Sequence, residues 1–198
     1  MGQVPIKNDM TPVAKTLKML GVEVIAFDFD GTLCMIQYPD NGEWTIPKYN
    51  DKEKKKLLKH IKSKTSDDAI ALLLACLYNG IYVAIATHQD HTRNGKLHPE
   101  RKEYRYEGEP LIRSFLTDIV GKEWAERIPI IDNAESGKLG NKLFHMQKLQ
   151  KHFSVKPNEI CMVDDRPQVI QALRKKGYLA IFVEQAYEAF QVSDFSEP

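Results

Sequence analysis

Short apolar runs alternate with helix-like segments along most of the chain. The first run, 22–27, is nearly continuous and rich in β-branched residues, which is typical of a strand buried on both faces of a parallel sheet. Similar runs follow at 81–86, 127–131, 159–163 and 179–183. This alternation predicts an α/β fold: a three-layer α/β/α sandwich around a five-stranded parallel sheet, with right-handed crossovers.

Capping signals mark the helices between these strands. Helices are expected at 11–20, 66–78, 110–120 and 142–153. Thr11 is predicted to be the N-cap of the first helix because Pro12 suits the first helical position. Ser66 is predicted to cap the second helix. Residues 1–10 and 190–198 are expected to be loose tails, so the whole chain is predicted to form one domain.

A β-hairpin is predicted after the first strand, within an insert that spans 34–50. Residues 35–38 and 43–46 flank a Pro-Asp-Asn-Gly sequence, which suits a glycine-containing turn. Tyr38 and Trp44 on this hairpin have two possible roles. They lean over the carboxyl edge of the sheet as substrate contacts, or they pack on the domain surface, and the sequence supports both interpretations about equally.

Composition and charge narrow the class of protein. The net charge is +1, and 42% of the residues are hydrophobic, so no global attraction to nucleic acid or to membranes is indicated. No apolar run reaches transmembrane length, and the N-terminus has no signal-peptide core. Cys34, Cys76 and Cys161 form no close-spaced metal pattern, and the last two are expected to be core thiols. These features favour a cytoplasmic, reducing compartment.

One segment departs from this even charge balance. Residues 51–64 are strongly basic. They form either a groove for an anionic substrate or a solvated helix face or loop, and we favour the second interpretation.

Acidic side chains follow two of the predicted strands directly. Asp28 and Asp30 end the first strand, and Asp164 and Asp165 end the fourth. Because residues i and i+2 of a strand point the same way, Asp28 and Asp30 can face one ligand at the carboxyl edge of the sheet. Buried carboxylates are costly to desolvate and repel one another unless a hard cation lies between them. The second pair also has a simpler interpretation, since acids favour the start of a helix that contains Pro167, and the two interpretations are compatible.

The stretch Asp28-Phe-Asp-Gly-Thr-Leu33 resembles the first motif of the haloacid-dehalogenase-like (HAD) phosphohydrolases. The resemblance implies that Asp28 attacks phosphorus to form an aspartyl-phosphate, and that Asp30 is the general acid and base. Thr87, at the end of the next strand, resembles the second motif, whose hydroxyl binds the phosphoryl group. Asp164 and Asp165 resemble the fourth motif. The implied Mg²⁺ ligands are Asp28, the backbone carbonyl of Asp30, Asp165 and, with it, Asp164.

The third motif supplies a lysine near the start of a helix, which neutralises the nucleophile and the phosphate. Lys142 has the better position and Lys138 is the reserve candidate, whereas Lys148 lies too far along the helix. Lys142-x-x-His145-Met-x-x-Leu149 resembles the magnesium-dependent phosphatase-1 branch of capless HAD enzymes. The sequence departs from that branch at Gly31, where the branch usually has an aromatic residue.

Histidines cluster after the second motif. His88, His91 and His98 stand three and seven residues apart, which matches no common zinc-ligand spacing, and no cysteine is near. A loop that contacts substrate is favoured over a zinc site because this segment leaves the carboxyl end of a strand. His88 is therefore a candidate substrate-binding residue, together with Thr87 and Lys142.

These features together predict a Mg²⁺-dependent phosphomonoester hydrolase. The resemblance implies the strand order 5-4-1-2-3, and the inserts are too short for a large cap, which favours a phosphoprotein or another bulky phosphoester as the phosphorylated partner. A small-metabolite phosphatase that hydrolyses nucleotide or sugar phosphates is the alternative, and nucleic acids with a 3′-phosphate end stay possible substrates. A catalytically silent phosphoryl-binding module is the alternative from another class. A dehalogenase would not need Asp30, and a phosphomutase would need a closing cap.

Overall fold

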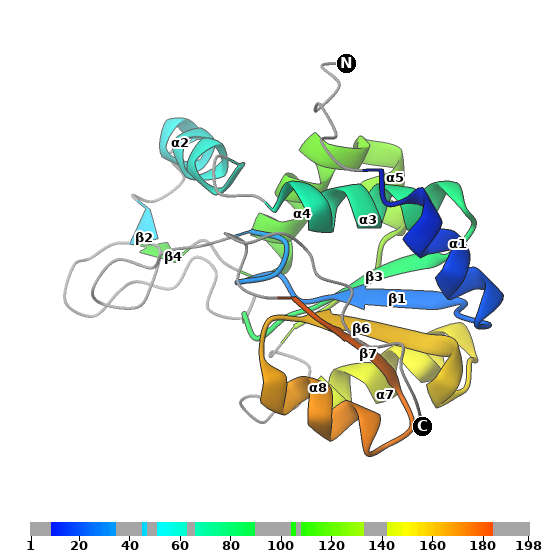
Figure 1. Ribbon diagram of the computed structural model, residues 1–198. Helices are drawn as coiled ribbons and strands as arrows, with labels where there is room; N and C mark the ends of the chain where they lie inside the picture. The colour runs from blue at the N-terminus through cyan, green and yellow to red at the C-terminus, as the bar shows by residue number, and fades with distance from the viewer. Residues whose placement is uncertain are drawn as a thin grey trace.

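A five-stranded parallel sheet forms the centre of the molecule (Figure 1). The computed structural model describes residues 9–34, 45–46, 51–62, 66–89, 104–105, 108–132 and 142–183. The strands of the sheet are β1 (Val24–Phe27), β3 (Tyr82–Ala86), β5 (Ile130–Ile131), β6 (Ile160–Asp164) and β7 (Leu179–Phe182). Their order is β5-β3-β1-β6-β7, and every pairing is parallel. When these five strands are numbered 1 to 5 along the chain, the order is 3-2-1-4-5. This is the predicted order 5-4-1-2-3 counted from the opposite edge of the sheet, so the predicted fold class is confirmed.

Helices cover both faces of the sheet (Figure 1). One layer contains α1 (Thr11–Met19), α3 (Asp67–Tyr78), α4 (Glu109–Val120) and α5 (Lys122–Arg127); the other contains α7 (Lys142–Phe153) and α8 (Pro167–Arg174). Strand alternation produces these two cores. In β1, Ile25 and Phe27 pack in the first, and Val24 and Ala26 in the second. Both faces of the central strand are therefore buried, as its unbroken apolar run predicts.

Three smaller elements complete the described chain. They are the short strands β2 (Thr45–Ile46) and β4 (Tyr104–Arg105) and the 3₁₀ turn η2 (Pro157–Glu159) before β6, and the 12-residue helix α2 (Asp51–Lys62) is described besides them. The basic segment is thus helical over Asp51–Lys62. β2 pairs antiparallel with β4, a partner that the sequence did not indicate, while 35–44 lie outside the described residues. No helix in the described ranges is both long and apolar enough to span a membrane.

Two predicted element boundaries are wrong. Thr11 is the first residue of α1 rather than its N-cap, and the Asp9 carboxylate accepts the Thr11 N–H at 2.9 Å. Arg127 ends α5 instead of starting a strand, because Glu123 and Arg127 form an i,i+4 ion pair at 2.7 Å and Ala125 is buried. The strand there is limited to Ile130–Ile131.

Two further predictions about single residues are confirmed. The Ser66 hydroxyl accepts the Ala69 N–H at 3.2 Å and so caps α3. Cys76 and Cys161 are buried free thiols.

Candidate active site

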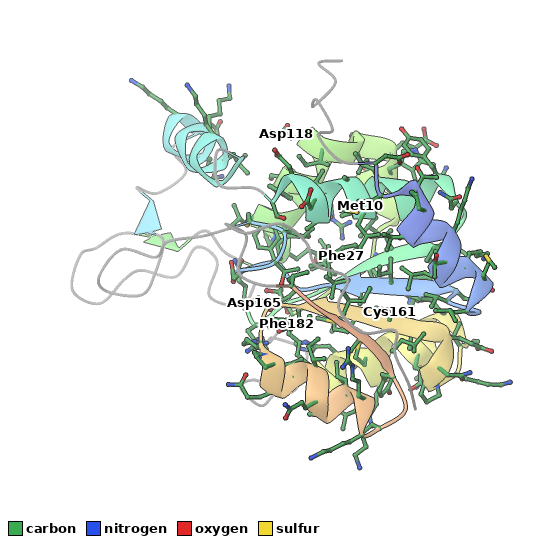
Figure 2. All side chains as sticks on the ribbon, in the orientation of Figure 1. Met10, Phe27, Asp118, Cys161, Asp165 and Phe182 are labelled. Carbon is green, nitrogen blue, oxygen red and sulfur yellow. The ribbon has the colours of Figure 1, made fainter. Side chains whose placement is uncertain are left out.

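The parallel register brings acidic side chains from separate parts of the chain to one edge of the sheet. Phe27 pairs with Ile85 on one side and with Val163 on the other. The next residue of each strand therefore lies at the same level, which puts Asp28 beside Asp164. Figure 2 labels Asp165 at this edge, near Phe182, the last residue of β7.

Three of these carboxylates are close enough to share a cation. Asp28, Asp164 and Asp165 each offer an oxygen within 4.8 Å of the others. Within the described part of the chain, Asp165 Oδ1 is buried and has no hydrogen-bond partner. Burial, followed by the charge of Asp164, raises the pKa of Asp165. Oxygen donors that are crowded and short of hydrogen bonds suit a hard divalent cation such as Mg²⁺.

Gly31 makes room for this arrangement. Its φ is +83°, a left-handed conformation that favours glycine. A Cβ atom at this position would lie 2.3 Å from Asp165 Oδ2, well inside contact distance. This chain therefore needs glycine at position 31 to hold the Asp165 carboxylate.

Asp28 is almost completely buried, with 3% of its surface exposed. Its Oδ1 accepts the Phe29 N–H at 2.8 Å and the Lys142 ammonium at 2.7 Å, which leaves Oδ2 less engaged. Burial raises the pKa of Asp28 to about 7; Lys142 opposes this shift and Asp164 adds to it. A cation at Oδ2 would favour the charged form.

Lys142 begins α7 and is buried against the acids. It donates to Asp28 Oδ1 and to the Ala86 carbonyl, and its Nζ lies 3.6 Å from Asp164 Oδ2. An ammonium has three N–H donors, and three oxygens surround this one. Lys148 instead lies over the Phe144 ring, 5.5 Å from its centroid. Of the two candidate lysines, Lys142 reaches the site, and Lys138 lies outside the described residues.

Thr87 and Asp30 are linked by a residue that the sequence interpretation missed. The buried Thr87 hydroxyl accepts the Gln89 N–H at 3.2 Å, so its own proton can be donated. The Gln89 amide donates to both Asp30 oxygens, at 2.9 and 3.1 Å. Its oxygen accepts the Gly108 N–H at 2.7 Å, which fixes the orientation of the amide. Gln89 stands two residues after Thr87, so in an extended chain the two side chains point the same way. This spacing was the signal in the sequence that could have identified Gln89 as a residue of the site.

An arginine and two histidines lie beside the acids. Arg166 contacts Asp164 and Asp28, and its Nη2 lies 3.0 Å from His88 Nδ1. His145 is fully buried, and the centroids of the His88 and His145 rings are 5.9 Å apart. Burial, followed by the charge of Lys142, lowers the pKa of His145 to about 3, so its ring is neutral. The structure thus brings His88 to the site edge, through a partner that the sequence did not indicate.

The remaining predicted contact residues cannot be placed. Tyr38, Trp44, His91 and His98 lie outside the described residues, so the substrate-binding roles of Tyr38 and Trp44 stay predictions.

Comparison with known proteins gives structural matches alone. No protein-family model matches the chain, and no curated protein does. An uncharacterized protein from Listeria monocytogenes serotype 4b is 16% identical, with a TM-score of 0.48, over 89% of this chain and 85% of that one. The 3-deoxy-D-manno-octulosonate 8-phosphate phosphatase of Moraxella catarrhalis, solved with magnesium and phosphate ions, is 17% identical, with a TM-score of 0.41, over 89% and 77%.

A third match is the N-terminal part of a Bacteroides fragilis protein that contains a phosphatase domain complexed with Mg. It is 15% identical, with a TM-score of 0.46, over 86% of this chain and 38% of that one. At such low similarity, the assignment of an activity rests on the chain's own residues.

Proposed function

We propose that this protein is a HAD-type, Mg²⁺-dependent phosphomonoester hydrolase. The observation that carries the proposal is the joint placement of Asp28, Lys142 and the Asp164-Asp165 pair at one edge of the sheet. These are the residues that the motif resemblance singles out, and Asp28 stands more than a hundred residues before the others in the sequence. A metal alone would not need the lysine, and a structural ion pair alone would not need three clustered acids.

The proposed reaction runs in two steps on Asp28. Its Oδ2 attacks phosphorus, so that a new O–P bond forms while the bond to the ester oxygen breaks. Asp30 donates a proton to the departing alcohol. Water then attacks the phosphoryl group, Asp30 takes the water proton, and inorganic phosphate leaves with Asp28 restored.

The other residues of the site support these steps. The Thr87 hydroxyl donates to a phosphoryl oxygen. Lys142 holds Asp28 Oδ1, so that Oδ2 is directed outward. Gln89 keeps both Asp30 oxygens in place for proton transfer. Asp28, Asp165, Asp164 and the Asp30 carbonyl would hold Mg²⁺, which supplies positive charge that lets a carboxylate approach an anionic phosphate.

A phosphate-release assay tests this function. The folded wild-type protein should release phosphate from p-nitrophenyl phosphate with Mg²⁺, and chelation of the metal should stop the release. Asp28→Asn should abolish the release while circular dichroism stays unchanged. Arg127→Gln, on the remote helix α5, is the control and should keep wild-type activity. If wild-type protein binds Mg²⁺ and phosphate but releases none from any ester in a phosphometabolite and phosphopeptide screen, it is the silent binding module instead.

A further inference from the structure

The cations of the site differ in how much of their hydrogen-bonding capacity is used. Lys142 donates hydrogen bonds to Asp28 Oδ1 and the Ala86 carbonyl, forms an ion pair with Asp164 Oδ2 at 3.6 Å, and has a side chain that is only 2% exposed. Its ammonium is therefore occupied by protein oxygens and shielded from solvent. Arg166 has a side chain that is 38% exposed, so solvent and substrate can reach it.

The contacts of Arg166 use only one side of its guanidinium group. Nε lies 3.2 Å from Asp164 Oδ1, and Nη2 faces His88 Nδ1 at 3.0 Å, Asp164 Oδ2 at 3.4 Å and Asp28 Oδ2 at 3.6 Å. Nη1 makes no hydrogen bond or ion pair to any residue in the described ranges. The two N–H donors of Nη1 therefore belong to a permanent cation whose Nη2 lies 3.6 Å from Asp28 Oδ2, the oxygen that attacks phosphorus in the proposed reaction.

Arg166 is also held firmly in this place. Its backbone N–H donates to Asp164 Oδ1 at 3.0 Å. Because a guanidinium can only donate, the Nδ1 atom of His88 must be the acceptor in their contact, so that His88 is neutral there. Planar guanidinium groups that keep two donors available are well suited to phosphate oxygens.

We propose that Arg166 is a substrate-binding residue that holds the phosphoryl group through Nη1, while it competes electrostatically with Mg²⁺ for Asp28 and Asp164. The catalytic meaning of this inference rests on the proposed function, and its binding part does not. The family resemblance implied that Lys142 contacts the phosphate, and the inference assigns this contact to Arg166. Lys142 is then the residue that orients Asp28.

Two binding measurements on the full chain test the inference. Calorimetric titration with Mg²⁺ alone measures metal affinity, and titration with inorganic phosphate at saturating Mg²⁺ measures phosphate affinity. In Arg166→Gln, phosphate affinity should fall about 10- to 100-fold, as expected for a lost charge-assisted hydrogen bond. Mg²⁺ affinity should rise severalfold, because a cation beside two of its ligands has been removed.

Control variants separate this role from a structural one. Arg127→Gln removes an arginine of an exposed ion pair, and both affinities should stay within about twofold of wild type. Arg166→Lys keeps the positive charge but lacks the planar guanidinium with its fixed pairs of N–H donors. Phosphate affinity should therefore fall while Mg²⁺ affinity stays near wild type. The lysine variant decides the matter if the glutamine variant does not fold.

Two results would overturn the inference. Unchanged phosphate affinity in the Arg166 variants would remove the substrate contact. A joint loss of Mg²⁺ and phosphate affinity would mean that Arg166 only supports Asp164. Inorganic phosphate is not turned over, so these binding results are independent of whether the wild-type protein hydrolyses any ester.

Discussion

At the scale of single residues, Gly31 shows most clearly how backbone and site depend on each other. Gly31→Ala should destabilise the fold by about 1–3 kcal/mol, because alanine is strained at φ +83°. It should also weaken Mg²⁺ binding, because the new methyl group displaces the Asp165 carboxylate. Denaturant unfolding and calorimetric titration measure the two effects.

Gly21 provides the matched control for this prediction. Its φ is +82°, and a Cβ atom there would meet nothing within 4 Å. Gly21→Ala should therefore lose stability through backbone strain alone and keep wild-type Mg²⁺ affinity. Equal Mg²⁺ affinities in the two variants would contradict the role assigned to Gly31.

His145 makes stability depend on pH. Its pKa in the folded protein is about 3, against 6.5 for an ordinary histidine, because burial and the nearby positive charges of Lys142 and Arg166 disfavour the charged ring. The unfolded chain thus binds a proton that the folded chain does not. This contribution to stability is complete above pH 6.5, and about 1.4 kcal/mol is lost per pH unit between 6.5 and 3.

The variant His145→Leu should remove this dependence. Denaturant unfolding at pH 7.5 and pH 5.5 gives the loss of stability for each protein, and wild type should lose about 1.4 kcal/mol more than the variant. The comparison cancels the titration of groups that both proteins share, Asp28 among them. An identical loss in the two proteins would show that His145 has the same pKa in the folded protein as in the unfolded chain.

At the scale of elements, the cap of α3 ties a helix to the loop that carries the first motif. The Ser66 hydroxyl accepts the Ala69 N–H, and the Ser66 N–H donates to the Leu33 carbonyl at 3.0 Å. Ser66→Ala should cost about 1 kcal/mol of unfolding free energy, while Ser66→Thr should keep most of the cap. Thermal unfolding measures both. A variant Ser66→Ala as stable as wild type would mean that water replaces the hydroxyl without loss.

The strands that carry the site were predictable, and its supporting contacts were not. β1 and β6 are buried on both faces, so a continuous apolar run marks them, and their acids stand out as the first polar residues afterwards. Gln89 and Arg166 have no such contrast with their neighbours. Their roles depend on which strand ends and loops meet, and this is decided by tertiary register rather than by local pattern.

Short elements show the same limit of local pattern. β5 has only two residues, so the extent of an apolar run could not separate it from the end of α5. The β2–β4 pair joins segments almost sixty residues apart, which no local pattern encodes.

At the scale of the whole molecule, metal binding and folding are linked. Mg²⁺ that binds only the folded chain should raise its unfolding free energy by about 2.7 kcal/mol at a hundredfold excess over Kd. Asp165→Asn should lose this gain. Without metal, the same variant should be at least as stable as wild type, because Asp165 Oδ1 has no partner in the described structure and Asp164 repels its charge.

Asp164→Asn provides the contrast. Asp164 is fully buried and accepts hydrogen bonds from the backbone and side chain of Arg166, with Lys142 also near, so the charge that it carries is compensated. Its removal should destabilise the metal-free protein. Thermal unfolding with and without Mg²⁺ measures all four states. Equal behaviour of the two variants would contradict the different roles assigned to the two acids.

The central claim is that Asp28 carries the phosphoryl group during turnover. Asp30→Asn keeps the nucleophile and removes the base that activates water, so it should accumulate the intermediate when the leaving group needs no proton, as in p-nitrophenyl phosphate. Acid quenching and mass spectrometry should then find one phosphoryl group on the peptide that contains Asp28. This adduct should require Mg²⁺ and should be absent from Asp28→Asn. A phosphoryl group on another residue, or phosphate release by folded Asp28→Asn at the wild-type rate, would contradict the account.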